Sequence, residues 1–571
     1  MLGWFLSRIT GKASDPLALY HAGAFVEAER LAEERLQKNA ADRKASLAQA
    51  MLLVDRGRGK DAIEIAERLL APARKDAQAW LVIARAHSSV GRRKAAGEAL
   101  ASAAKLAGNE PSVRAELALH ALSEGRVDDA AKHLERVRGG GPRVAKAHSE
   151  LGADLLHRQQ REAAARHLQQ AIATDPNDAV AHANLGALRK DEGSFDEAAR
   201  LLERAVELQP ALVEAAFNLA MLRIQDRNWS GAQRLLRDYV AARPRDADAQ
   251  YWLANALVGD GDVAGARAAC QAALRADNQH ARARWALVMS QLPAVPMSVS
   301  EQQAGLADFG TELDKLALWC RTKAPEGVHE AVGSQQPFFI AYIEDNHREV
   351  LKRYGALCTE LMGQWARRVK VPEPAPARGG KLKVGIVSAH IHSHSVWHAL
   401  LRGWVEHLDA DRFELQLFHT GMLEDAETKW AASRVAHLHH DLGGWTSWAK
   451  AVSDAQLDVL IYPEIGMDST TVRLASLRLA RVQLAGWGHP VTTGLPTIDG
   501  FLSAEAFEPA DAQQHYSEKL VALPGLGCAY PPTAPKRKRP TWPSGASRRT
   551  TACCSRRASP SSTRRPTTRS G

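Results

Sequence analysis

Four histidines stand close together in the stretch "HIHSHSVWH", which runs from His390 to His398. Three of them, at positions 390, 392 and 394, alternate in a way that could suit a zinc ion. No carboxylate or cysteine lies nearby in the sequence to complete such a site, so we expect no metal. An imidazole in such a loop can instead take a proton from a hydroxyl group or orient a nucleophile. The structural alternative is a loop of solvated histidines at the start of a helix.

A second candidate site is the stretch "GHPVTTG", from Gly488 to Gly494. Its hydroxyls and backbone N–H groups suit the approach of a sugar or a phosphate. We assign substrate binding to His489, Thr492, Thr493 and Gly494. The alternative is a tight structural turn enforced by the proline and the last glycine of the stretch.

A third loop, "PEIGMD", contains Glu464. This carboxylate could act as a base, or it could be a charge that caps the following helix. We favour the capping interpretation.

All three loops fall between predicted strands and helices. The strands "LKVGIV", "RFELQLF", "LDVLIYP" and "VQLAGWG" alternate with the helices "VWHALLRGWVEHL", "WTSWAKAVSDA" and "STTVRLASLRLA". This order predicts a parallel, doubly wound sheet. Ligands of such sheets bind beyond the carboxyl ends of the strands, and the three loops lie there.

The first half of the chain repeats itself every 34 residues. Alanine recurs at Ala28, Ala62, Ala96, Ala130, Ala164, Ala198, Ala232 and Ala266. Glycine recurs at Gly23, Gly57, Gly91 and Gly125, and proline at Pro142, Pro176, Pro210 and Pro244. This period resembles the tetratricopeptide repeat, in which two antiparallel helices meet at small residues. We predict eight units over roughly residues 9–280 and a capping helix near 281–292.

An array of such repeats coils into an α-superhelix whose concave face binds a protein or peptide. The alternative is a rigid spacer that binds nothing. After residue 298 the repeat stops, and residues 299–370, which include "FFIAYIEDNHREVLKRYGALCTELMGQWARRV", have helical spacing. Proline and glycine in "VPEPAPARGG" then mark a linker.

The composition is that of a globular protein: 571 residues, 45% hydrophobic and 24% charged. No apolar run approaches membrane-spanning length, and "MLGWFLSR" is too short for a secretory signal. The six cysteines show no disulfide framework, which is typical of reduced thiols. We expect a soluble cytoplasmic protein.

Several stretches behind the repeats resemble the SPINDLY-type O-linked N-acetylglucosamine transferases. They are "VGIVSAHIHSHSVWHALLRGW", "DVLIYPEIGMD", "LASLRLARVQLAGWGHPVTTGLPTIDGFLS" and "HYSEKLVALPG". The resemblance covers the repeats and roughly residues 335–530. It implies the first Rossmann-like lobe of a two-lobed (GT-B) glycosyltransferase that inverts the sugar carbon without a metal. It also implies a nucleotide-sugar donor, UDP-GlcNAc or another UDP-hexose, and a protein acceptor.

The same resemblance implies a catalytic role for His394, which matches the family's H-x-x-x-H after the first strand. Bacterial relatives that transfer glucose to asparagine share this style of loop and stay open as an alternative. A rival function from another class is a non-catalytic adaptor that uses its repeats to join proteins.

These observations divide the chain into four predicted parts. They are a repeat array (residues 1–292), a helical linker region (293–379), the Rossmann-like lobe (380–530) and a basic tail (531–571). Residues 533–571 hold eleven Lys and Arg and no acid, so they contribute +11 to a net charge of +9 and leave −2 for the remainder.

The tail is rich in Arg, Ser, Thr and Pro and has almost nothing to bury. We interpret it as coding sequence read out of frame, with the second lobe of the enzyme missing. On that interpretation we expect this chain to have no measurable transferase activity. The alternative is a basic arm that binds nucleic-acid backbones, without aromatic residues interleaved for base stacking.

Overall fold

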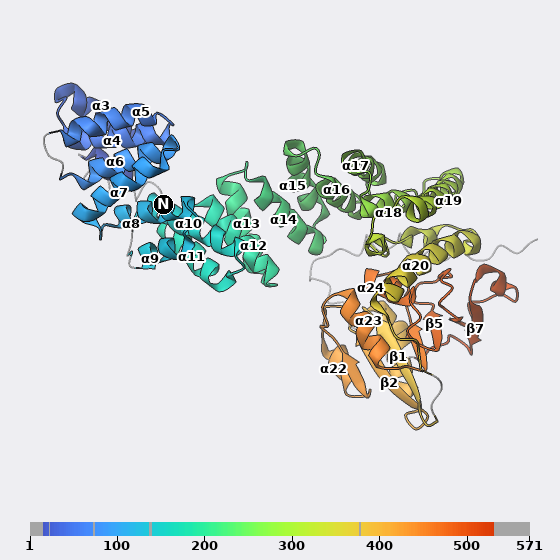
Figure 1. Cartoon of the computed structure of the whole chain (residues 1–571). Coiled ribbons are helices and arrows are strands. Elements are labelled where there is room, and N and C mark those ends of the chain that lie inside the picture. Colours follow the sequence, from blue (N-terminus) through green and yellow to red (C-terminus); the bar gives the residue numbers. More distant parts are fainter. Residues whose placement is uncertain are drawn as a thin grey trace, which may run out of the picture.

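The computed structural model describes residues 15–21, 23–71, 75–135, 137, 140–375 and 379–529 of the chain. A long array of paired helices leads to a smaller α/β lobe beneath its C-terminal end (Figure 1). The predicted basic tail lies outside the described residues. Within the described ranges no helix is both long and apolar enough to cross a membrane, and the four cysteines there form no disulfide.

The array consists of antiparallel helix pairs, of which the described residues contain eight. The pairs are α2 (Pro16–His21) with α3 (Phe25–Lys38), α4 (Arg43–Asp55) with α5 (Gly59–Leu70), α6 (Ala77–Ser89) with α7 (Arg93–Ala107), α8 (Pro111–Ser123) with α9 (Val127–Glu135), α10 (Pro142–His157) with α11 (Arg161–Thr174), α12 (Ala179–Asp191) with α13 (Phe195–Leu208), α14 (Val213–Gln225) with α15 (Trp229–Ala242), and α16 (Ala247–Gly259) with α17 (Val263–Ala276). A single helix, α18 (Ala281–Met289), follows the last pair. The predicted repeat array is therefore confirmed.

The recurring alanines lie inside this array. All eight, from Ala28 to Ala266 at intervals of 34, are completely buried. A small side chain at these positions lets neighbouring helices approach closely. The apolar residues of the array form a succession of separate clusters, because each repeat packs mainly on its neighbours.

The turn inside each helix pair contains one residue with a left-handed backbone. Glycine fills this position in six of the eight described pairs: Gly23, Gly57, Gly91, Gly125, Gly193 and Gly261. Gln159 (φ 62°) and Arg227 (φ 56°) fill it in the other two. A side chain in this conformation costs about 1–2 kcal/mol.

Two long helices, α19 (Val299–Thr322) and α20 (Arg348–Val369), connect the array to the lobe. The region 299–370 that we predict to be helical is interrupted, because α19 ends at Thr322 and α20 begins at Arg348, with only the short 3₁₀ turns η1 (Val328–Ala331) and η2 (Phe338–Tyr342) between them. Asp345 Oδ1 accepts the Asn346 N–H, and Asn346 Oδ1 accepts the Arg348 N–H. These side chains compete for backbone donors that an earlier helix start would use.

The lobe is built on a seven-stranded, fully parallel sheet in the order β3-β2-β1-β4-β5-β6-β7. The strands are β1 (Leu382–Ser388), β2 (Phe413–His419), β3 (His437–His439), β4 (Val459–Tyr462), β5 (Val482–Gly486), β6 (Gly500–Ala504) and β7 (Lys519–Leu523). The chain runs from β1 out to β3 and returns to β4 beside β1, so the winding reverses between β1 and β4. The predicted parallel, doubly wound sheet is confirmed.

Six helical segments in the described residues of the lobe connect its strands: the π turn η3 (Trp397–Leu401), α21 (Arg402–His407), α22 (Ala426–Ala432), α23 (Trp445–Asp454), α24 (Ser469–Ala475) and the 3₁₀ turn η4 (Ala512–His515). The core of the sheet continues into the end of the array. One apolar cluster joins Trp285 of α18, Phe309 of α19, Tyr354 of α20 and Tyr462 of β4. The last helix of the array and the lobe therefore share a core.

Candidate functional site at the carboxyl edge of the sheet

Glu464, just after β4, anchors the loop that follows β1. The Ser388 hydroxyl donates a 2.6 Å hydrogen bond to Glu464 Oε1, and the Ala389 N–H donates to the same oxygen at 3.2 Å. The N–H of His390 in turn donates to Ser388 Oγ at 3.0 Å. Because the winding of the sheet reverses between β1 and β4, this carboxyl lies at the edge where doubly wound sheets bind ligands.

Burial changes the charge of this carboxyl. Glu464 is completely buried, and burial raises its pKa to about 8, with the nearby Asp468 adding to the rise against the hydrogen bond from Ser388. Glu464 is therefore neutral at pH 7. Our capping interpretation of Glu464 is wrong, because Asp468 caps α24 by accepting the Thr471 N–H at 2.9 Å. Burial also raises the pKa of Asp468, to about 6.

Several buried polar atoms near the carboxyl ends of the strands have no hydrogen-bond partner in the described part of the chain. They follow β1, β2, β4 and β5, and they are His390 Nε2, Thr420 Oγ1, Glu464 Oε2, Asp468 Oδ2 and Trp487 Nε1. An unsatisfied buried group costs about 1–3 kcal/mol, so native proteins hold few of them. Other buried atoms without a partner lie in the array and in the linker, so the five at this edge mark a candidate place for a ligand.

The histidine loop places its rings against one another. The rings of His390 and His394 stack with centroids 3.9 Å apart, and His392 lies 5.6 Å from His394. His394 Nδ1 accepts the Val396 N–H at 3.2 Å, and His398 Nε2 lies 3.2 Å from Ser393 Oγ. In the described residues no three His, Cys, Asp or Glu side chains are grouped as metal ligands.

Burial and neighbouring groups lower the pKa of His390, His392 and His394 and so favour their neutral form. Burial, together with the adjacent histidines, lowers the pKa of His390 to about 4. Burial also lowers the pKa of His394, and His392 and Arg227 add to this effect. Arg227 belongs to the turn between α14 and α15, so the array places a positive charge within reach of this loop.

Helix α22 holds the histidine loop from the other side. Asp425, which caps α22, accepts the Ser393 N–H at 2.8 Å, and the Thr428 hydroxyl donates to the Ile391 carbonyl at 2.6 Å. Glu427 accepts the Trp397 indole N–H at 2.8 Å. Asp425 and Thr428 thus hold the backbone of the loop that carries His394, and Glu427 holds the Trp397 side chain.

The two threonines of the loop after β5 face into the protein. The Thr492 hydroxyl donates to Glu518 Oε2 at 2.6 Å, and the Thr493 N–H donates to Glu518 Oε1 at 2.9 Å. The Thr493 hydroxyl donates to the same carboxylate. All three residues are buried. These contacts tie the loop to the start of β7.

Gly494 and His489 pack against the helical linker. A Cβ at Gly494 would lie 1.9 Å from the carbonyl oxygen of Leu351 in α20, and the backbone is left-handed there (φ +71°). His489 stacks on Phe338 with centroids 5.5 Å apart, and burial lowers its pKa to about 4. The cavity that His489 and the two threonines line measures about 30 Å³, room for about one water molecule and not for a sugar.

The two predicted groups make no direct contact in the described residues, although both loops adjoin Glu464. In the described residues no hydrogen bond or ring contact joins His394 to the loop from His489 to Gly494. The catalytic assignment of His394 and the substrate-binding assignment of His489, Thr492, Thr493 and Gly494 stay predictions. Sequence reasoning missed the bridging role of Glu464. A carboxylate directly after a buried strand run was the available signal.

The Tetratricopeptide repeat family matches residues 115–179, 150–212 and 217–281. The SPINDLY protein of Arabidopsis thaliana, a UDP-N-acetylglucosamine–peptide N-acetylglucosaminyltransferase by name, is 25% identical over 198 residues, which cover 34% of this chain and 21% of that protein. SEC of the same plant, which bears the same enzyme name, is 27% identical over 207 residues, covering 34% and 20%.

One solved structure, a mutant of the Thermobaculum terrenum O-GlcNAc transferase, aligns with a TM-score of 0.42 and 20% identity over 60% of this chain and 57% of that one. The matched part of the present chain spans about a fifth of the length of the two plant relatives. The chain thus carries tetratricopeptide repeats and is similar in sequence to the SPINDLY and SEC N-acetylglucosaminyltransferases.

Proposed function

We propose that the chain is part of a protein glycosyltransferase of the O-linked N-acetylglucosamine transferase type, which moves a sugar from a UDP-sugar to a protein side chain. The observation that carries this proposal is the set of unpaired buried polar atoms around Glu464 at the carboxyl edge of the sheet. A sugar offers several hydroxyl groups, each able to donate and accept a hydrogen bond. Sequence similarity to SPINDLY and SEC supports the same reaction class.

In this reaction His394 acts as a hydrogen-bond donor. Its Nδ1 accepts the Val396 N–H, so the neutral ring carries its proton on Nε2. A donor at this position orients the acceptor hydroxyl or stabilises negative charge on a leaving oxygen. The lowered pKa of His394 keeps the ring in this neutral form at pH 7. Neutral Glu464 contributes by holding the backbone of the loop.

The repeat array serves this function by holding the protein acceptor, as concave repeat surfaces commonly do. The adaptor alternative needs the array alone. Sugar binding by the lobe therefore separates the two functions.

Saturation-transfer NMR on the purified chain tests the proposal with UDP-GlcNAc, free GlcNAc and UDP as separate ligands, because this method detects weak binding. We expect saturation of the sugar protons in UDP-GlcNAc and its loss in His394→Ala. His398→Ala is the matched control, since His398 is an exposed histidine of the same loop. Absence of saturation from all three ligands would contradict the proposal and favour the adaptor.

A transfer assay with a protein acceptor measures the role of His394 directly. Wherever turnover is measurable, His394→Ala should lower it by about 10²–10⁴ with a smaller change in donor affinity. A loss smaller than about threefold would remove His394 from the reaction.

A further inference from the structure

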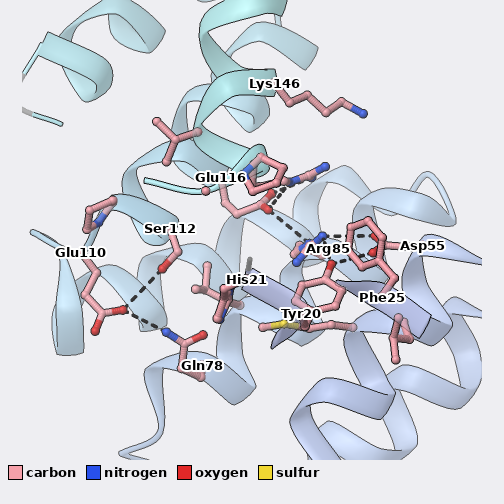
Figure 2. Close-up of a pocket in the computed structure, with 18 of the residues that line it drawn as sticks. Tyr20, His21, Phe25, Asp55, Gln78, Arg85, Glu110, Ser112, Glu116 and Lys146 are labelled. Carbon is pink, nitrogen blue, oxygen red and sulfur yellow. Dashed lines mark hydrogen bonds and ion pairs between the residues drawn. The ribbon is translucent and has the colours of Figure 1, made fainter. Parts of the chain in front are cut away.

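The first five repeats curve so that the first repeat contacts the fifth. A Cβ added to Gly141, just before α10, would lie 2.5 Å from the carbonyl oxygen of His21 at the end of α2. A Cβ on Gly23 would lie 3.6 Å from Pro142 Cγ. Repeats of a solenoid ordinarily contact only their sequence neighbours. Here the first repeat meets the fifth, and the helices between them surround a pocket (Figure 2).

The pocket is large and mostly apolar. Its volume is about 690 Å³, which is within the range of about 300–1,000 Å³ that ligand pockets occupy. Tyr20, Phe25, Met51, Leu81 and Val144 supply apolar wall from helices of the first, second, third and fifth repeats. Phe25 is 45% exposed at this surface, so a bulky apolar side chain remains uncovered.

The charged side chains deep in the pocket form ion pairs with one another, while Arg85 Nε makes no hydrogen bond in the described residues. Arg85 donates to the Tyr20 hydroxyl at 2.8 Å and to Asp55 at 3.2 Å, and it pairs with Glu116 at 3.2 Å (Figure 2). Arg143 donates two hydrogen bonds to Glu116. Two guanidinium groups thus balance two carboxylates. The network leaves the apolar wall as the main attraction for an occupant.

One carboxylate of the pocket lining differs from the others. Glu110 accepts from Gln78 Nε2 at 2.9 Å and from the Ser112 hydroxyl at 3.4 Å, and it meets no cation in the described residues. Gln78 Oε1 is buried without a hydrogen-bond partner in the same ranges. An occupant with an apolar face and a positive charge would match the apolar wall and the carboxylate of Glu110.

Such an occupant exists in the chain itself. Residues 1–14, "MLGWFLSRITGKAS", lie outside the described residues and join α2, which supplies Tyr20 and His21 to the pocket. Leu2, Phe5, Leu6 and Ile9 follow the i, i+3, i+4, i+7 spacing of segments that lay one apolar face in a groove. The segment also holds Arg8 and Lys12 and no acid.

We propose that the pocket of the first five repeats binds the segment Met1–Ser14 of its own chain, with the apolar face of Leu2 to Ile9 against the apolar wall and the basic residues near Glu110. The short tether raises the effective concentration of the segment at the pocket, so modest contacts suffice. The occupied pocket excludes other polypeptides from the N-terminal end of the array. This inference does not depend on the proposed transferase function.

Trypsin cleavage after Arg8 and Lys12 in the full 571-residue chain tests the proposal, with initial rates followed by intact mass spectrometry. Phe25→Glu places a charge on the pocket surface, and Val26→Glu is the matched control at the neighbouring, 77% exposed position outside the pocket. We expect about tenfold faster cleavage in Phe25→Glu and an unchanged rate in Val26→Glu, because cleavage follows the population of the released segment. Equal rates in the wild type and Phe25→Glu would overturn the proposal.

A variant of the segment completes the test. Phe5→Ser should accelerate cleavage as Phe25→Glu does, whereas Ser7→Ala, off the apolar face, should not. The double variant Phe5→Ser/Phe25→Glu should be no faster than either single variant, because both remove the same contact. Additive acceleration would mean that the two residues do not meet, and the pocket would then be free for a different occupant.

Discussion

The array and the lobe both depend on glycine, but for opposite reasons. Gly57 and Gly91 in the turns of the array have left-handed backbones (φ +77° and +74°), and nothing lies within 4 Å of where a Cβ would be. In the lobe, a Cβ on Gly355 of α20 would lie 2.1 Å from the Gly494 carbonyl oxygen. The turn glycines of the array need a left-handed conformation, whereas Gly355 and Gly494 let two backbones touch. The open turns of the array therefore have room for an added side chain, and the contact between α20 and the loop after β5 does not.

The largest expected effect comes from Gly494→Ala. The new Cβ would meet the Leu351 backbone in a conformation that already disfavours a side chain, and we expect a loss of about 5 kcal/mol in stability. Hydrogen–deuterium exchange read by mass spectrometry would show this as lost protection in α20 and the sheet, with the N-terminal repeats unchanged.

Gly91→Ala is the matched substitution in the array. It meets the same left-handed backbone without a neighbour, so we expect a loss of about 1 kcal/mol confined to the third repeat. Equal losses of stability in Gly91→Ala and Gly494→Ala would contradict this difference between the array and the lobe.

The next prediction concerns the effect of Glu464→Gln on stability. The folded-state pKa of Glu464 is about 8 against an ordinary value of 4.5, so the folded chain binds a proton that the unfolded chain releases between these values. The wild type therefore loses about 1.4 kcal/mol of stability for each pH unit from 4.5 to 8 through this group. Gln keeps a neutral acceptor for Ser388 and does not titrate. We expect the variant to be more stable than the wild type by about 3 kcal/mol at pH 7.

Chemical denaturation at a series of pH values measures this gap. It should vanish below pH 4.5, widen up to pH 8 and stay constant above. A gap that does not change with pH would show that Glu464 is charged in the folded lobe.

The smallest effects concern the two array turns without glycine. Gln159→Gly and Arg227→Gly should each stabilise their repeat by about 0.5–1 kcal/mol. Glycine removes the strain of the left-handed backbone, but the greater conformational entropy that it loses on folding cancels part of this gain. Arg227→Gly should also raise the pKa of His394, measured by NMR titration of the imidazole, since the Arg227 charge lowers it. Gln159→Gly is the control for that shift. A similar shift in both variants would mean that the Arg227 charge does not lower the pKa of His394.

The sequence predicted the array well because its information is periodic. The spacing of Ala28, Ala62 and their equivalents fixes which residues are buried, and the same period locates each turn. In the lobe, long apolar runs predicted β1, β2, β4 and β5. The strands β3, β6 and β7 and the helix α22 were not predicted; β3 has three residues, and β6 and β7 each pair along the sheet with a neighbouring strand.

The candidate site was harder to predict because its contacts join distant positions. Glu518 holds Thr492 and Thr493 from the start of β7, and Glu464 reaches across the sheet to Ser388. No pattern in the sequence pairs these residues. The histidine loop could be found from its composition, but its stacked rings and its neutral carboxyl anchor depend on burial that the sequence does not display.

The shared core of α18 and the lobe has a consequence for synthesis on the ribosome. Each helix pair of the array can fold as soon as the next repeat emerges, because its contacts are local. Trp285 ends the array, yet its apolar cluster includes Tyr516, just before the last strand. The nascent chain therefore carries a finished array beside an incomplete, exposed core until nearly the whole lobe has left the ribosome. Chaperones are expected to engage the chain at this junction and not at the repeats.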